Sequence, residues 1–220
     1  MGIFSRIVTF FQGGGFMMYP IAIVLVIGLA IALERWIYLT VTSLRNRSLW
    51  HEIAPVLAQG NFRQAVQMTS KSSAAIGQIL SYGLARIASA RRRDDIEKAM
   101  EESLMDITPR LEKRTHYIAT FANLATLLGL LGTVVGLINA FAAVATVNPA
   151  EKANLLSASI SVAMNCTAFG LMTAVPLLLI HAVLQTKTTE LVDSLEMASV
   201  KFLNAVTERQ PTPAPTTAAA

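Results

Sequence analysis

The chain has 220 residues, of which 53% are hydrophobic and 15% are charged, and its mean hydropathy is +0.51. This composition excludes an ordinary soluble domain and predicts a membrane protein. The 18 Lys and Arg against 14 Asp and Glu give a net charge of +4, but without the aromatic interleaving of a nucleic-acid-binding surface. One cysteine, Cys166, and three scattered histidines exclude disulfide and zinc scaffolds, so we predict no metal and no cofactor.

Residues 1–15 predict a short amphipathic helix in the membrane interface, followed by a glycine hinge. Six apolar residues precede the run of three glycines: Ile3, Phe4, Ile7, Val8, Phe10 and Phe11. The alternative is a frayed terminus.

Residues 16–40 predict the first transmembrane helix, since the stretch from Phe16 to Leu33 is uncharged, apolar and long enough to cross a bilayer. It ends in a charged and aromatic set that suits an interface: Glu34, Arg35, Trp36 and Tyr38. Only Arg6 precedes it as a charge, and no small-residue cleavage site follows it closely, so we do not expect a cleaved signal peptide.

Residues 41–116 predict a small helical cytoplasmic domain. This segment holds 12 of the Lys and Arg residues, which the positive-inside rule assigns to the cytoplasm. Helical periodicity recurs on both sides of Gly60-Asn61, which predicts a turn. From Asp94 onward we expect a helix that runs, with a disturbance at Pro109, into the second span.

Residues 117–145 and 155–183 predict the second and third transmembrane helices, joined by a tight periplasmic turn at 146–154. The uncharged stretches Tyr117–Ala150 and Ala153–Thr186 have 34 residues each. A helix of that length measures roughly 50 Å, which exceeds a hydrocarbon core of about 30 Å, so both helices should extend into the cytoplasm. The N-terminus is then outside and the C-terminus inside.

Residues 184–209 predict a cytoplasmic helix with an apolar seam at spacings of four and three: Leu184, Thr188, Leu191, Leu195, Ala198, Phe202 and Ala205. The seam is typical either of a coiled coil or of an amphipathic helix that packs on its own domain. Residues 210–220 contain three prolines and predict a disordered tail. The fold class is therefore all-α, a polytopic membrane protein with three transmembrane helices.

The second and third spans contain no Asp, Glu, Lys or Arg, but each carries a stripe of small and weakly polar residues. The stripes are Thr126, Gly129, Thr133, Gly136 and Ala140 on one helix, and Ser159, Ala163, Thr167, Gly170 and Ala174 on the other. Small residues let helices approach closely, so tight packing is one interpretation. The other is a pore lined by hydroxyls. Composition alone does not choose between them.

Four segments closely resemble the MotA/TolQ/ExbB proton-channel family, and its ExbB/TolQ branch in particular. They are LERWIYL at 33–39, LAQGNFRQAVQM at 57–68, ATLLGLLGTVVGLINAF at 125–141 and AMNCTAFGLMTAVP at 163–176. The two membrane motifs are specific in combination, and the resemblance covers nearly all of residues 16–190.

The resemblance implies a bacterial inner-membrane subunit that forms a ring, usually a pentamer, around the single spans of an ExbD- or TolR-like partner whose aspartate carries the proton. Thr133 and Thr167 match the two pore threonines of the family. With them we expect four further pore-lining residues, namely Thr126, Ser159, Ala163 and Gly170. We expect helix packing at Gly129, Gly132, Gly136, Asn165 and Ala174.

Three positions depart from common family patterns: Val162 stands where many relatives have glutamate, Cys166 where others have threonine, and Thr126 where others have proline. Asn165 points about 160° away from Thr167 on the helix, which favours an inter-helix hydrogen bond over a pore role. For His181 we favour an interfacial histidine, with a proton-exit relay as the alternative.

The resemblance thus implies a motor subunit, driven by the proton-motive force, that acts on a periplasmic or outer-membrane system such as TonB-dependent transport, with a TonB- or TolA-like protein as a further partner. A gliding or Tol-type envelope motor is the alternative within the family. A non-conducting membrane scaffold is the alternative of a different class. No nucleophile–base pair is visible, so an enzyme is not expected.

Overall fold

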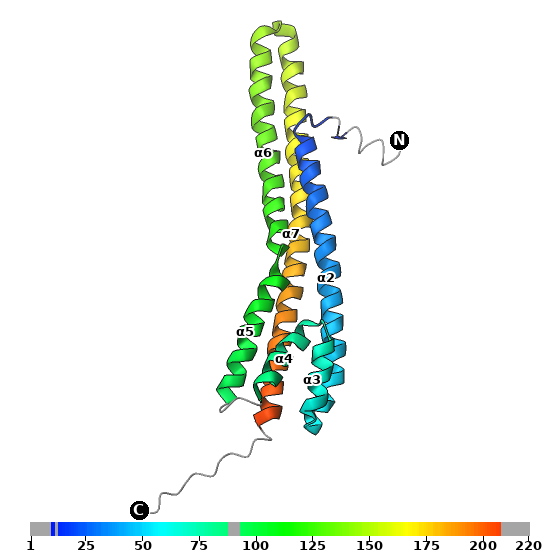
Figure 1. The fold of residues 1–220 in the computed structure, drawn as a ribbon. Coiled ribbons are helices and arrows are strands. Elements are labelled where there is room, and N and C mark those ends of the chain that lie inside the picture. The colour runs from blue at the N-terminus through cyan, green and yellow to red at the C-terminus, as the bar shows by residue number, and fades with distance from the viewer. Residues whose placement is uncertain (1–9, 12, 88–92, 208–220) are drawn as a thin grey trace, which may run out of the picture. The chain divides into compact units, whose positions relative to one another are not determined.

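The structure is a computed structural model, and it describes residues 10, 11, 13–87 and 93–207 (Figure 1). Over these residues it contains helices and no strands. The helices are α2 (Met18–Gln59), α3 (Phe62–Lys71), α4 (Ala75–Ile87), α5 (Arg93–Glu112), α6 (Thr115–Thr146) and α7 (Pro149–Thr207). Most of the expected interfacial helix and the whole of the expected disordered tail lie outside the described residues.

Three stretches are long and apolar enough to cross a membrane: Met18–Gln59, Arg93–Thr146 and Pro149–Thr207. This confirms the predicted all-α fold class with three candidate spans. Each stretch is longer than the roughly 20 residues that a bilayer needs, because a more polar helical part adjoins the apolar part. The side of the membrane on which each terminus lies stays a prediction.

The chain divides into two compact units. Residues 1–36 and 114–185 form the first, which we call the span unit, and residues 37–113 and 186–220 form the second, which we call the helical unit. Helices α2 and α7 contribute residues to both units. The predicted domain boundaries stay predictions.

In the span unit, α6 and α7 are antiparallel neighbours joined by a very short connection (Figure 1). Only Val147 and Asn148 separate the two helices. Pro149 takes the first position of α7, where its missing N–H costs nothing and its fixed φ suits the helix. The carbonyl of Asn148 accepts a hydrogen bond from Glu151 N at 3.0 Å, which begins the helix at once.

The helix that leads into the second span is broken at residues 113–114 and not at Pro109, which corrects the sequence prediction. Pro109 lies inside α5, and Lys113 N still donates to the Pro109 carbonyl at 3.0 Å. The break follows where Arg114 takes a left-handed conformation with φ of 68°. A proline removes one intrahelical hydrogen bond, whereas a left-handed residue ends the helix outright.

In the helical unit, α4 packs against α3 and α5. The predicted turn at Gly60-Asn61 is present: Gly60 has a φ of 78°, and Asn61 Oδ1 accepts from Gln64 N at 3.2 Å to cap α3. Gly83 of α4 lies so close to Met100 and Phe202 that a Cβ there would meet both side chains. The sequence therefore places a glycine where α4, α5 and α7 converge.

The apolar seam of α7 is buried inside the single chain. Six of its members are at most 4% exposed: Leu184, Thr188, Leu191, Leu195, Ala198 and Phe202. Of the two interpretations that the spacing left open, packing of an amphipathic helix on its own chain is the one observed. The seam is thus not available for a coiled coil with another chain.

Candidate functional site

The seam between α6 and α7 is held by glycines whose backbones touch. A Cβ added to Gly129 would lie 3.2 Å from Gly170 Cα, and one added to Gly170 would lie 2.8 Å from the Ala125 carbonyl oxygen. Farther along the seam, a Cβ on Gly136 would lie 3.0 Å from Ala163 Cβ. Small residues allow this approach, and no larger side chain fits without moving backbone.

Three threonines lie along this seam, and each hydroxyl donates to a backbone carbonyl. Thr167 Oγ1 donates across the seam to Gly129 O at 2.9 Å. Thr133 Oγ1 donates to Leu130 O at 2.6 Å, and Thr126 Oγ1 donates to Ala122 O at 3.2 Å, both within α6. Each oxygen keeps lone pairs with which it can accept a further hydrogen bond.

On α6, Thr126 and Thr133 lie on the flank that faces away from α2. An α-helix turns by about 100° per residue. Around the axis of α6, Thr126 therefore lies about 60° and Thr133 about 40° from Gly129 in one direction. Gly132 lies about 60° from Gly129 in the opposite direction. The Gly132 flank is the covered one, since a Cβ there would meet Cys166 and Met17. Thr126 is exposed and Thr133 is half-buried.

On α7, Thr167 lies on the corresponding flank. Gly170 and Leu177 stand about 60° and about 80° from it to one side, and Leu177 contacts Gly28 of α2. Because α6 and α7 are antiparallel, Thr126, Thr133 and Thr167 fall on the same edge of the seam. We call these three residues the threonine edge.

The other side of α7 is covered by the glycine-rich segment that precedes α2. Asn165 Nδ2 donates to Gly13 O at 3.4 Å, and a Cβ on Gly15 would lie 3.2 Å from Val162 Cγ1. The rings of Phe10 and Phe11 pack edge-on against Phe169. The amide of Asn165 therefore bonds to this segment, in place of the expected inter-helix bond, and stands away from the threonine edge.

The remaining predicted site residues lie mostly inside the chain. Ala163, Gly170 and Ala174 are buried, as are Gly129 and Gly132, while Ser159 and Gly136 are half-buried. Ala163 and Gly170, which we predicted to line a pore, contact α6 of the same chain. Their roles in a pore stay predictions, as do those of the threonine edge.

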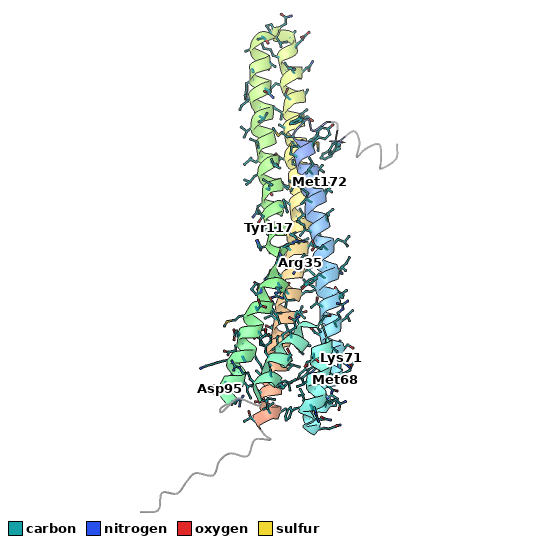
Figure 2. All side chains as sticks on the ribbon, in the orientation of Figure 1. Arg35, Met68, Lys71, Asp95, Tyr117 and Met172 are labelled. Atoms are coloured by element: carbon teal, nitrogen blue, oxygen red, sulfur yellow. The ribbon has the colours of Figure 1, made fainter. Side chains whose placement is uncertain are left out.

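Two charged residues at the end of the first span form a site that the sequence interpretation assigned only to an interface. Arg35 is 4% exposed, and its Nε donates to Thr115 Oγ1 at 3.3 Å (Figure 2). Its neighbour Glu34 accepts from Arg114 Nη1 at 2.8 Å. The sequence signal for the burial of Arg35 is its spacing. Arg35 lies three residues after Ala32 and four before Leu39, so it falls on the buried face of α2.

Comparison with known proteins matches a family model, described as the MotA/TolQ/ExbB proton channel family, to residues 71–197, which are more than half of the chain. A protein of Methanothermobacter thermautotrophicus, named as an ExbB homolog in biopolymer transport, is 24% identical over 199 residues, covering 90% of this chain and 69% of the relative. The biopolymer transport protein exbB1 of Vibrio cholerae is 30% identical over 153 residues, covering 63% of this chain and 66% of the relative. The chain thus spans about two thirds of the length of these relatives. With its three candidate spans and this match, the chain is a multi-pass membrane protein that belongs to the MotA/TolQ/ExbB proton channel family, in its ExbB branch.

Proposed function

We propose that this chain is the ring-forming subunit of an inner-membrane motor that couples proton flow to work on a periplasmic or outer-membrane partner. Family membership supports the motor, and the names of the two relatives support biopolymer transport as the kind of work. The N-terminus lies outside and the C-terminus inside. The ring has five copies and encloses the single spans of an ExbD- or TolR-like partner, which in turn engages a TonB- or TolA-like protein.

The threonine edge is the observation that carries this proposal. It presents hydroxyls on two helices whose spans contain no Asp, Glu, Lys or Arg, on the side that α2 does not cover. A proton path through such helices needs an ionisable group from elsewhere, because hydroxyls do not titrate at physiological pH. An aspartate on the partner's span fits that requirement.

In this mechanism the threonines solvate the partner's carboxyl group in both of its protonation states. A protonated carboxyl group donates its O–H to the threonine oxygen. The lone pairs of that oxygen are available for this bond while the threonine O–H still donates to the backbone carbonyl. A carboxylate needs donors, so a hydroxyl rotates away from its carbonyl toward the charge. The bonds of Thr126 and Thr133 to α6 carbonyls are local bonds from a side chain to the backbone of its own helix, so breaking them leaves the packing of α6 on α7 unchanged.

Replacing Thr133 or Thr167 by valine tests the role of the hydroxyl at nearly constant shape. A hydrogen bond to a charged group contributes about 1.5–3 kcal/mol, so we expect proton-coupled output to fall about tenfold or more. The assay is proton flux in vesicles that contain the ring and its partner, at matched protein levels. Assembly should persist, because inter-helix hydrogen bonds within membranes contribute only about 0.6 kcal/mol on average.

Thr120→Val is the matched control, because Thr120 bonds to His116 O on the same helix, is exposed, and stands about 180° from Gly129. It should retain full flux. Full flux in Thr133→Val and Thr167→Val as well would reject the pore role. The seam would then serve packing alone, as the Thr167–Gly129 bond within one chain also allows. A non-conducting scaffold would be the better description only if the wild-type ring and its partner gave no flux.

A second test concerns the ring. Only 17% of the most apolar window of the Arg93–Thr146 stretch is buried inside the chain, so most of that surface is left for lipid or for other copies. With small residues at a close-packed seam, we expect copies to associate. Native mass measurement of the full chain in several mild detergents and in lipid discs should find one closed oligomer. Monomers under every condition would exclude a ring.

A further inference from the structure

A cavity of about 510 Å³ lies within the helical unit, outside the site described above. Residues of α2 and α7 supply most of its lining, and Ile76 of α4 contributes to it. Its volume falls in the range of small-molecule binding sites, which is about 300–1,000 Å³. It is partly open to solvent, so a ligand can enter without unfolding of the unit.

A buried amide lines this cavity with one of its polar groups unused. Asn46 is 4% exposed, and its Oδ1 accepts from Ile76 N at 3.2 Å. That bond fixes the orientation of the amide, since the opposite orientation would set Nδ2 against the Ile76 N–H. Among the residues that the structure describes, Nδ2 has no hydrogen-bond partner. An unmet buried donor is costly, so an acceptor from an ordered water or from a bound molecule would stabilise this position.

The charges around the cavity are balanced. Arg47 and Lys201 line it as cations, and Glu190 and Asp193 line it as carboxylates. Across the described parts of the chain the structure records no ion pair for these four side chains. A ligand that carries charge of only one sign would be repelled by two of these side chains. A ligand that carries both signs can form a favourable ionic contact with all four.

We propose that this cavity binds a small zwitterion that carries a phosphate and a primary ammonium group, of the phosphoethanolamine type. The phosphate accepts from Asn46 Nδ2 and from the Arg47 guanidinium, with Lys201 as a second cation. The ammonium donates to Glu190 and Asp193. A phosphate fits better than a carboxylate because it offers more acceptor oxygens to these several donors.

The test uses the full chain in a neutral maltoside detergent with free O-phosphoethanolamine as the probe. The chain has two tryptophans, and Trp50 lines the cavity, so a Trp36→Phe variant reports binding through Trp50 emission. We expect a saturable change. Phosphocholine, which has no ammonium N–H, and inorganic phosphate, which has no ammonium at all, should both bind at least about tenfold more weakly.

Variants on this background assign the contacts. Asn46→Asp keeps the acceptor for Ile76 N and removes the donor, and Arg47→Gln changes an exposed side chain without risk to folding. Both should weaken phosphoethanolamine binding at least about tenfold. Arg45→Gln is the matched control, since Arg45 is an exposed neighbour that does not line this cavity. Equal affinity of Arg47→Gln and Arg45→Gln would overturn the site.

The carboxylates are tested with the double variant Glu190→Gln, Asp193→Asn, whose control is Glu196→Gln on the same helix. It should weaken phosphoethanolamine but not inorganic phosphate. If the wild type binds both probes equally and the double variant changes neither, the cavity is a plain anion site and the proposal fails.

The source of the zwitterion is decided in lipid discs of phosphatidylethanolamine or phosphatidylglycerol. If the group is a lipid headgroup, phosphatidylethanolamine discs will suppress binding of the free probe and phosphatidylglycerol discs will not. If it is a free metabolite, the probe will bind equally in both. Either outcome supports the site, whereas no binding of the probe and no retained phosphatidylethanolamine overturns it.

Discussion

At Arg114, which directly precedes α6, backbone strain and an ion pair have opposite effects on stability. Among the described residues it is the only non-glycine with a positive φ, at 68°, a conformation that costs an L-residue roughly 1–2 kcal/mol. Its guanidinium in turn bonds both carboxylate oxygens of Glu34, at 2.8 and 3.0 Å, in a half-exposed ion pair. Such pairs contribute about 0–1 kcal/mol, so the ion pair offsets only part of the strain.

Arg114→Gly should therefore leave thermal stability unchanged or raise it by up to about 1 kcal/mol, because the relief of strain at least offsets the lost ion pair. Arg114→Val should destabilise by about 1–2 kcal/mol, since a β-branched residue suits this φ least. Thermal unfolding in a single detergent measures both. Arg110→Gly, in the helical part of α5, is the control. It removes the exposed Arg110–Asp106 ion pair as well as helix propensity, and should cost about 1–2 kcal/mol. A loss of that size in Arg114→Gly would show that the ion pair dominates.

At the scale of elements, the contact between α6 and α7 is a backbone contact. A Cβ added to Gly170 would lie 2.8 Å from the Ala125 carbonyl oxygen. The atoms in contact there belong to the backbone, so no side chain can move aside to make room. Gly28 of α2 is as close to α7, but it faces the methyl ends of Leu177 at 3.0 Å. A flexible side chain can move by a few tenths of an ångström where a helix backbone cannot.

The two glycines therefore predict different outcomes for the same substitution. Gly170→Ala should destabilise by about 1–3 kcal/mol relative to Gly28→Ala, because overpacking against backbone separates the helices. The gain in helix propensity, about 1 kcal/mol, is common to both and cancels in the comparison. Thermal unfolding in detergent measures the difference. Equal midpoints would mean that the seam is looser than its geometry indicates.

At the scale of the whole molecule, the proposed topology follows from charge. The basic residues gather between the first and second spans, and the connection at Val147-Asn148 carries no charge. Orientation in the membrane follows the basic residues of such connections. The loop between α3 and α4 should then face the cytoplasm and the connection between α6 and α7 the periplasm.

Single cysteines test this topology in a Cys166→Ala background, which removes the chain's only cysteine. In intact cells with a permeable outer membrane, Asn148→Cys should react with an impermeant maleimide. Ser73→Cys, at an exposed position between α3 and α4, should react only after the inner membrane is opened. The reverse pattern of labelling would invert the topology.

The sequence by itself determined the features that depend on neighbouring residues. The number of apolar helices follows from the composition of stretches of about 20 residues. The turn follows from the Gly60-Asn61 pair, because glycine readily takes the positive φ that the turn has. The family follows from two membrane motifs. The positions of Thr126, Thr133 and Thr167 on their helices likewise follow from helical periodicity. Each of these is a local property that tertiary contacts do not reverse.

Only the tertiary structure decided which partner each polar side chain has. The hydroxyl of Thr167 bonds to a carbonyl 38 residues away, the amide of Asn165 to one 152 residues away, and Arg35 is buried against Thr115 at a separation of 80. The same holds for the α7 seam, whose spacing suited a coiled coil as well as the internal core that buries it. Spacing specifies which face of a helix is apolar, but what covers that face depends on how distant helices pack.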